Sequence, residues 1–233
     1  MSYQEKEYEV GAEKSFEALP EGTYGARVSG VIDLGTGKTK WFKTDPKTKE
    51  YVLDENGEKI PQYRREFSVN FEYYDGDKIG YASQQYGFSL GEDSGFFKLL
   101  KATGLAPEKG SKVRASTLAK ALIGKTLMVE TKNKTSATNG KVYPSVASAI
   151  PLMKGLQLPE LKNKAKDLFF DSFAEDVFKA LPQWMRDRIE ISEEYRAMLR
   201  SDAEDAKQAE LKDAINHPVT YTNEDGEEVT TAF

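Results

Sequence analysis

The chain has 233 residues, of which 39% are hydrophobic and 30% are charged, and its formal net charge is −5. It contains no cysteine, which excludes disulfide frameworks, thiolate zinc sites and cysteine nucleophiles and is typical of a reducing compartment. Its one histidine, His217, stands before Pro218 near a polar tail, so neither a histidine-based zinc site nor a Ser-His-Asp triad is expected.

The N-terminal residues MSYQEKEYEV have neither the basic nor the apolar region of a signal peptide, and no apolar run reaches the ~20 residues that span a bilayer. We therefore expect a cytoplasmic protein with no membrane partner. The charge is unevenly distributed. Residues 1–155 carry 23 Lys and Arg against 20 Asp and Glu, whereas residues 156–233 carry 10 against 18. A slightly basic body is thus followed by an acidic C-terminal part.

The first part of the chain predicts an arm, a strand and a long excursion. Residues 1–20 are acidic and irregular, and we expect an N-terminal arm. A strand is predicted over residues 23–32, where alternate residues share one face. Residues 35–62 are rich in Gly, Lys, Thr and Asp, and they are expected to form a hairpin-like excursion.

The next elements complete a β-rich body. The clearest strand covers residues 62–74, and a turn at 75–77 leads into a strand over residues 78–88. Short helices are predicted over residues 94–103 and 117–122, and two further strands over residues 124–131 and 141–150. Three strands, a helix and two strands is the order of an OB-fold, a partly open barrel that binds oligonucleotides. The sequence therefore predicts an all-β core over residues 21–155, an OB-fold-like five-stranded barrel with one or two short helices.

The C-terminal part has a different period. From Pro159 the apolar residues take helical spacing, which predicts a C-terminal α-helical extension over residues 156–215. This extension either packs on the barrel, burying Phe169, Phe178 and Trp184, or makes contacts between subunits. Residues 216–233 are predicted to be an acidic, disordered tail that ends in a phenylalanine.

Three segments combine cations with aromatic rings, as a protein that binds single strands without reading sequence requires. The excursion contributes Lys38, Lys40, Trp41, Phe42 and Lys43. The long strand contributes Tyr63, Arg64 and Arg65, and the last hairpin contributes Lys125, Lys132, Lys134, Lys141 and Tyr143. The alternatives are that the rings are buried in the core and that the basic hairpin is a solvated turn.

Two sequence patterns that could indicate an enzyme are incomplete. The segment GTGKT at residues 35–39 suggests a phosphate-binding loop, but Ile32 stands where the Walker pattern needs its first glycine. The carboxylates of the body are scattered at turns instead of gathered as in a metal nuclease. We expect no enzyme activity, no metal and no cofactor.

The tail carries four carboxylates, at Glu224, Asp225, Glu227 and Glu228, before Phe233. An acidic segment that ends in an aromatic ring suits a portable ligand for a protein partner with an apolar and basic pocket. It also suits competition with DNA for basic residues of the body at low salt. The alternative is a polar tail without a function.

Three segments of the chain resemble the phage-encoded single-stranded DNA-binding proteins. They are GTYGARVSGVIDLG, LIGKTLMVETKNKTSATNGKVYPSV and FKALPQWMRDRIEISEEY, and the likeness spans about residues 22–200 and the tail. The resemblance implies binding and protection of single-stranded DNA in phage DNA replication, recombination and repair, in the host cytoplasm. It also implies recruitment of replication or recombination proteins through the tail. The tail is similar in kind to the acidic tails of bacterial single-strand binding proteins, which also end in phenylalanine. It departs from their pattern, because Val229, Thr230, Thr231 and Ala232 stand between the acids and Phe233.

Two other functions fit the same sequence. A recombination mediator would bind single strands and also speed the annealing of complementary strands. A virion or scaffold protein would bind no DNA and would assemble through its helices.

Overall fold

The computed structural model describes residues 19–45, 47–135, 140, 142–201 and 204, together with the backbone of 219–222 and 228–231. Lys40 and Trp41 are likewise described by their backbone alone. The main sheet has six strands: β1 (Gly22–Phe42), β2 (Pro61–Asp75), β3 (Lys78–Gly87), β4 (Thr126–Thr135), β5 (Val142–Ile150) and β6 (Lys166–Leu168). Short helices connect and cover them: α1 (Gly95–Ala102), α2 (Ala115–Ala121), the 3-10 turn Phe170–Ser172, α3 (Glu175–Lys179), α4 (Gln183–Glu190) and a helix over residues 193–201.

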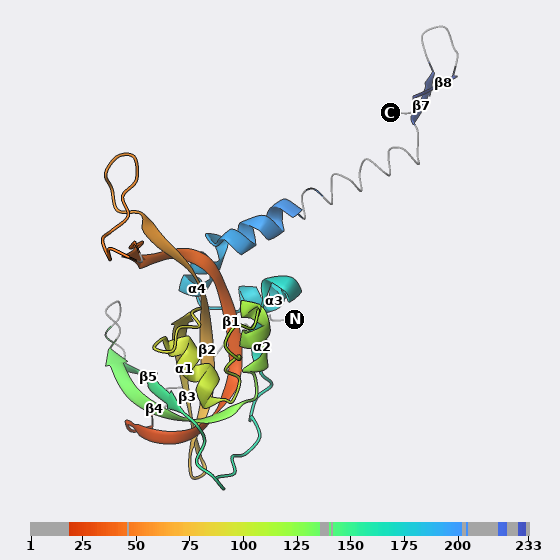
Figure 1. The fold of residues 1–233 in the computed structure, drawn as a ribbon. Coiled ribbons are helices and arrows are strands. Elements are labelled where there is room, and N and C mark those ends of the chain that lie inside the picture. Colours follow the sequence, from red (N-terminus) through yellow and green to blue (C-terminus); the bar gives the residue numbers. More distant parts are fainter. Residues whose placement is uncertain are drawn as a thin grey trace, which may run out of the picture.

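The sheet has the strand order β3-β2-β1-β4-β5, and each of these neighbours is antiparallel (Figure 1). This is a mainly antiparallel β fold with a few helices, OB-like in the order of its elements. The sheet is open between β3 and β5, where the Ser145 hydroxyl donates a hydrogen bond to Gln84 Oε1 at 2.9 Å.

The main core lies on the inner face of the sheet. Alternate residues of β2, including Phe67 and Phe71, are completely buried there, as the two-residue period requires. Helix α1 closes this core with Phe96, whose ring stacks on Phe67 with a centroid distance of 5.5 Å. The Ser94 side chain caps that helix by accepting from the backbone N–H of Phe97 at 3.2 Å.

A second core lies on the outer face of β1. Its buried residues are Ile32, Leu34, Leu168, Phe178, Met185 and Ile189. The C-terminal helices therefore pack on the sheet, which is one of the two arrangements expected for the extension. Phe169 and Phe178 are buried as that arrangement requires, but Trp184 remains 48% exposed.

Two predicted boundaries are wrong. Strand β1 continues to Phe42 and β2 begins at Pro61, so both ends of the expected excursion belong to strands and residues 43–60 form the loop between them. The helical extension also begins late, because residues 166–168 form β6, parallel to β1. Pairing of β1 with β4 ends at Arg27, and β6 satisfies the backbone groups that Gly30–Ile32 would otherwise leave free.

The tail also differs from the prediction of disorder. Val219–Thr222 and Glu228–Thr231 pair as the antiparallel strands β7 and β8. The physical reason is that both segments are rich in threonine and valine, which favour strands. Across the described residues, no helix is both long and apolar enough to cross a membrane.

We predict that Gly30→Ala destabilises the fold by about 1–3 kcal/mol, the usual cost of overpacking. A Cβ at this position would overlap the backbone carbonyl oxygen of Lys166 in the neighbouring strand, which cannot move without breaking the β1–β6 pairing. Urea unfolding measures the effect. Gly91→Ala is the control, since its Cβ would meet only Ser89 Oγ at 3.6 Å. Equal stability of both variants would contradict the close approach of β6.

Candidate nucleic-acid interface

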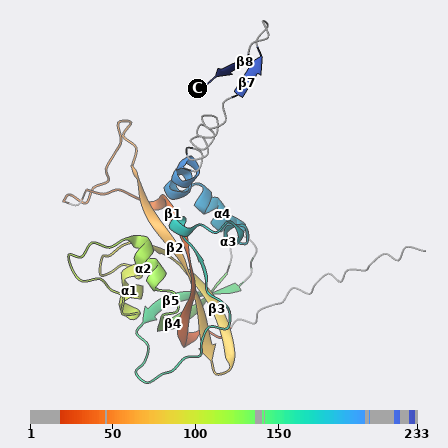
Figure 2. The same cartoon turned by 90° about the vertical axis from the view of Figure 1, so that its right-hand side faces the viewer.

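Strands β1 and β2 continue past the main core as a two-stranded arm, residues 36–42 with 61–65 (Figures 1 and 2). Lys38 is paired with Tyr63 across this arm. Directly opposite residues of an antiparallel pair share a face, so the two side chains are neighbours. Lys38 is exposed, and Tyr63 is 52% exposed. The structure thus brings together two of the segments that the sequence singled out.

Aromatic rings also gather at the end of the arm. Phe42, which is 40% exposed, meets the ring of Tyr51 edge-on with a centroid distance of 6.0 Å. Lys59 Nζ lies 4.0 Å from the Tyr51 centroid and 5.7 Å from that of Phe42. Lys43 is exposed beside them. The alternative that the rings are buried in the core therefore does not hold for Phe42.

The two arginines of β2 have different surroundings. Arg65 forms an ion pair with the buried Asp33, with Nη2 at 2.5 Å from Oδ2 and Nε at 3.2 Å from Oδ1. Burial raises the pKa of the Asp33 carboxyl, and Arg65 opposes that shift. The guanidinium of Arg65 is thus engaged inside the protein, which favours a structural role over contact with phosphate.

Arg64 is differently placed. Its side-chain stem crosses Gly87, where a Cβ would lie 2.5 Å from Arg64 Cδ. It lines a small cavity of about 310 Å³ with Gln85 and Ser94. Within the part of the chain that the structure describes, Arg64 makes no ion pair. Of the two arginines, Arg64 is the one whose charge is available to a ligand.

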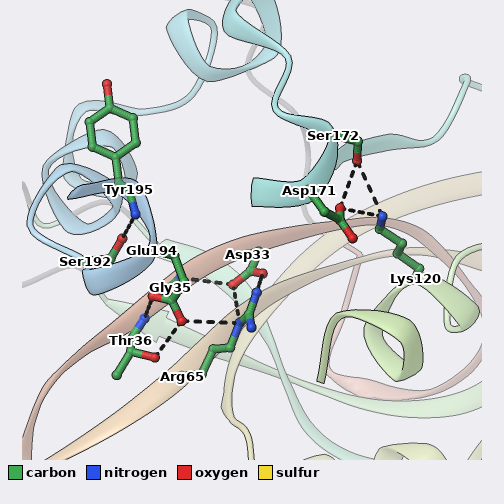
Figure 3. Close-up of polar contacts among 10 residues, drawn as sticks. All are labelled: Asp33, Gly35, Thr36, Arg65, Lys120, Asp171, Ser172, Ser192, Glu194 and Tyr195. Atoms are coloured by element: carbon green, nitrogen blue, oxygen red, sulfur yellow. Dashed lines mark hydrogen bonds and ion pairs between the residues drawn. The ribbon is translucent and has the colours of Figure 1, made fainter. Parts of the chain in front are cut away.

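The base of the arm is tied to the helical extension (Figure 3). The Glu194 carboxylate accepts from the backbone N–H of Thr36 at 2.6 Å and from its hydroxyl at 2.7 Å, and it lies 3.8 Å from Arg65 Nε. Arg188 adds an ion pair with Glu66 at 2.8 Å and donates to the carbonyl of Lys38 at 3.3 Å. The extension therefore fixes where the arm leaves the sheet.

The β4–β5 hairpin repeats the cation–ring pattern of the arm. Lys134 is paired with Tyr143, which is 47% exposed. Lys132 is exposed, and its ammonium lies 3.5 Å from Glu130. Lys125 is exposed at the other end of β4, roughly 23 Å from Lys132 at about 3.3 Å per residue, so it does not join this group. Lys141 lies outside the described residues.

A groove of about 730 Å³ runs along the outer face of β2 and β3. It is lined by Ser29, Asn70, Phe71, Glu72, Tyr81, Ala82, Ser83, Tyr143, Pro144, Asn163, Lys164 and Lys166. The sequence had singled out only Tyr143 among these. Tyr81 stands in a predicted strand without a cationic neighbour, and Lys164 and Lys166 were assigned to a helix. Their spacing of two residues is the signal that could have placed both on one side of an extended segment.

Of the tail residues, Glu224, Asp225, Glu227 and Phe233 lie outside the described residues, and Glu228 begins β8. Among the described side chains, no group of three His, Asp or Glu residues is placed to hold a metal ion.

No protein-family model and no curated protein sequence matches the chain. Among solved structures it is similar to yeast RPA bound to ssDNA, with 8% sequence identity and a TM-score of 0.29. That match covers 63% of this chain and 84% of the other. A likeness of this size carries no argument about function, which rests on the side chains described above.

We predict that Glu194→Ala lowers the free energy of unfolding by about 2 kcal/mol, because it removes hydrogen bonds between a carboxylate and Thr36. Chemical unfolding monitored by circular dichroism gives the value. The adjacent Glu193 is exposed, and Glu193→Ala serves as the control, with no change expected. If the two variants are equally stable, Glu194 does not anchor the extension.

Proposed function

We propose that this chain binds single-stranded DNA without strong sequence preference and without catalysing a reaction. The observation that carries the proposal is a repeated unit: an exposed lysine beside an exposed tyrosine on neighbouring strands. Lys38 and Tyr63 form one unit on the arm, and Lys134 and Tyr143 form the other on the β4–β5 hairpin. Neither lysine makes an ion pair with any described residue.

The chemistry of a single strand fits this unit. Each nucleotide offers a phosphate, which a lysine neutralises, and a flat base, which stacks on an aromatic ring. A duplex offers the same phosphates, but its bases are already stacked on one another. The rings therefore favour single strands, and they accept every base because each has a π-face.

The biological setting of the proposal rests on the resemblance to phage-encoded single-stranded DNA-binding proteins. The chain would coat strands exposed during phage DNA replication, recombination and repair in the host cytoplasm. Residues 218–233, with their four acids, would recruit replication or recombination proteins and compete with DNA for the lysines of the body.

The first prediction concerns salt and strandedness. Fluorescence anisotropy of labelled oligo-dT of about 30 nucleotides should show tight binding at low salt, and log Kd should rise linearly with log salt concentration, by about 0.7 per phosphate contact. The matching duplex should bind more weakly at each salt concentration. Equal affinity for duplex and single strand would contradict the role of the rings, and no binding would leave a structural role as the better account.

The second prediction concerns the rings. Tyr63→Ala and Tyr143→Ala should each weaken oligo-dT binding by about 1–3 kcal/mol, because each removes one stacking surface. Trp184→Ala is the matched control, since this ring is half-exposed on the helical extension. An equal loss in the control variant would show that the effect is not specific to the two units.

The third prediction concerns the tail. A chain truncated after Asn216 should bind oligo-dT more tightly than the full chain at low salt, with the difference shrinking as salt rises, because screening weakens the competing acids. Weaker binding by the truncated chain would overturn the competition.

A further inference from the structure

Paired residues of β2 and β3 form the floor of the groove on the outer face of these strands. Asn70 is paired with Ser83, and Glu72 with Tyr81, so these side chains point out of the same face of the sheet. Glu72 is buried, and its Oε1 accepts from Tyr74 OH at 2.8 Å and from the backbone N–H of Lys162 at 2.9 Å. The floor thus carries the amide of Asn70 and the hydroxyl of Ser83, with the buried Glu72 carboxylate beside them.

One wall of the groove is formed by Asn163, Lys164 and Lys166. The sheet holds the segment 158–166, to which they belong, at several points. The Arg27 guanidinium donates to the carbonyls of Leu158 and Pro159 at 3.3 and 3.0 Å. Lys162 is tied to Glu72, and Lys166 is paired with Gly30 in the β1–β6 ladder. A segment whose backbone is fixed at both ends holds its side chains in position before a ligand binds. Less conformational freedom is then lost on binding, so the entropic cost is lower.

Two tyrosines face the groove from different sides. Tyr81 is 38% exposed, and its hydroxyl accepts from Asn163 Nδ2 at 3.2 Å, so its ring is held against the wall. Burial, with the nearby Glu72 carboxylate, raises the pKa of that hydroxyl. Tyr143 stands at the β5 side.

The cations are at the rim. Lys164 and Lys166 are exposed, and neither makes an ion pair with a described residue. A phosphate is attracted to them and repelled by Glu72, whereas a base has no net charge and can donate an N–H group toward the floor, as thymine does through N3–H. The charges therefore fix the orientation of a bound nucleotide, with its base down and its phosphate at the rim.

We infer that this groove is a nucleotide-binding site in which the segment 163–166 acts as a fixed clamp. The base of one nucleotide of the bound strand lies against Tyr81 and Tyr143, and its phosphates contact Lys164 and Lys166. This inference rests on the proposed function and adds to it a site of which Tyr81, Lys164 and Lys166 lie outside the arm and the hairpin. Tyr143 belongs to both the hairpin unit and the groove, so the strand passes from one to the other.

The charge test uses the full chain and oligo-dT. Lys164→Gln with Lys166→Gln should raise Kd at least several-fold at low salt and lower the slope of log Kd against log salt by about 1.4, twice the roughly 0.7 per phosphate contact. Lys109→Gln with Lys112→Gln is the matched control, because both lysines are exposed on the loop between α1 and α2 and line no part of the groove.

The outcomes separate the two proposals. If wild type fails to bind oligo-dT, the proposed function itself fails. If wild type binds and the Lys164 and Lys166 variant keeps the wild-type slope, the clamp is wrong and the proposed function stands. If both double variants lower the slope of log Kd against log salt by the same amount, the effect is one of net charge, and the clamp is again wrong.

A positional test does not depend on affinity. Oligo-dT with 5-iododeoxyuridine at single positions should cross-link on irradiation to Tyr81, the tyrosine that belongs to the groove and not to the hairpin unit, as mapped by peptide mass spectrometry. Tyr81→Phe should keep the cross-link, because the ring remains, and Tyr81→Ala should lose the cross-link at that position. Cross-links confined to arm residues such as Tyr63 would overturn the inference.

Discussion

The arrangement depends on β1, a strand that is buried on both faces at its centre. Its inner face meets the main core through Val28 and Val31, while Ile32 and Leu34 on the outer face meet the C-terminal helices. The register of β1 with β2 shifts between Asp33 and Gly35, where Gly35 takes a positive φ of 71°. From that point the two strands separate from the core and become the arm.

The Asp33–Arg65 ion pair stands at this departure point. Burying a carboxylate is costly, and its raised pKa shows that the arginine does not fully offset the cost. Glu194 and Thr36 complete the polar contacts, so an element more than 150 residues later in the chain fixes the exit of the arm. The helical extension thus helps to position the binding residues of the arm. None of the binding residues predicted from the sequence lies in the extension.

The fold was largely predictable, because strand periodicity and turn residues are local signals. The period-2 pattern of residues 62–74 and the turn at Gly76 placed β2 and β3 correctly, and the element order gave the OB-like topology. The length of β1 was not predictable in this way. Residues 36–40 are only threonine, glycine and lysine because the arm has little core to cover, and such a strand looks like a loop. Strand β6 was missed because it is held by pairing with β1, and nothing local marks three residues as a strand.

The site was predictable in part for the same reason. The sequence analysis predicted lysines and tyrosines as binding residues, but their pairing across strands, Lys38 with Tyr63 and Lys134 with Tyr143, depends on register. The engagement of Arg65 depends on Asp33, which is 32 residues away in the sequence. The groove joins β3, β5 and the segment 163–166, which no sequence window contains.

The most direct test of the account is lysine footprinting of the full chain, with and without saturating oligo-dT, by acetylation and mass spectrometry. The account predicts that the single strand protects Lys38, Lys134, Lys164 and Lys166 and leaves Lys109 and Lys112 as reactive as before. Equal protection of all six lysines, or protection of Lys109 and Lys112 alone, would contradict it.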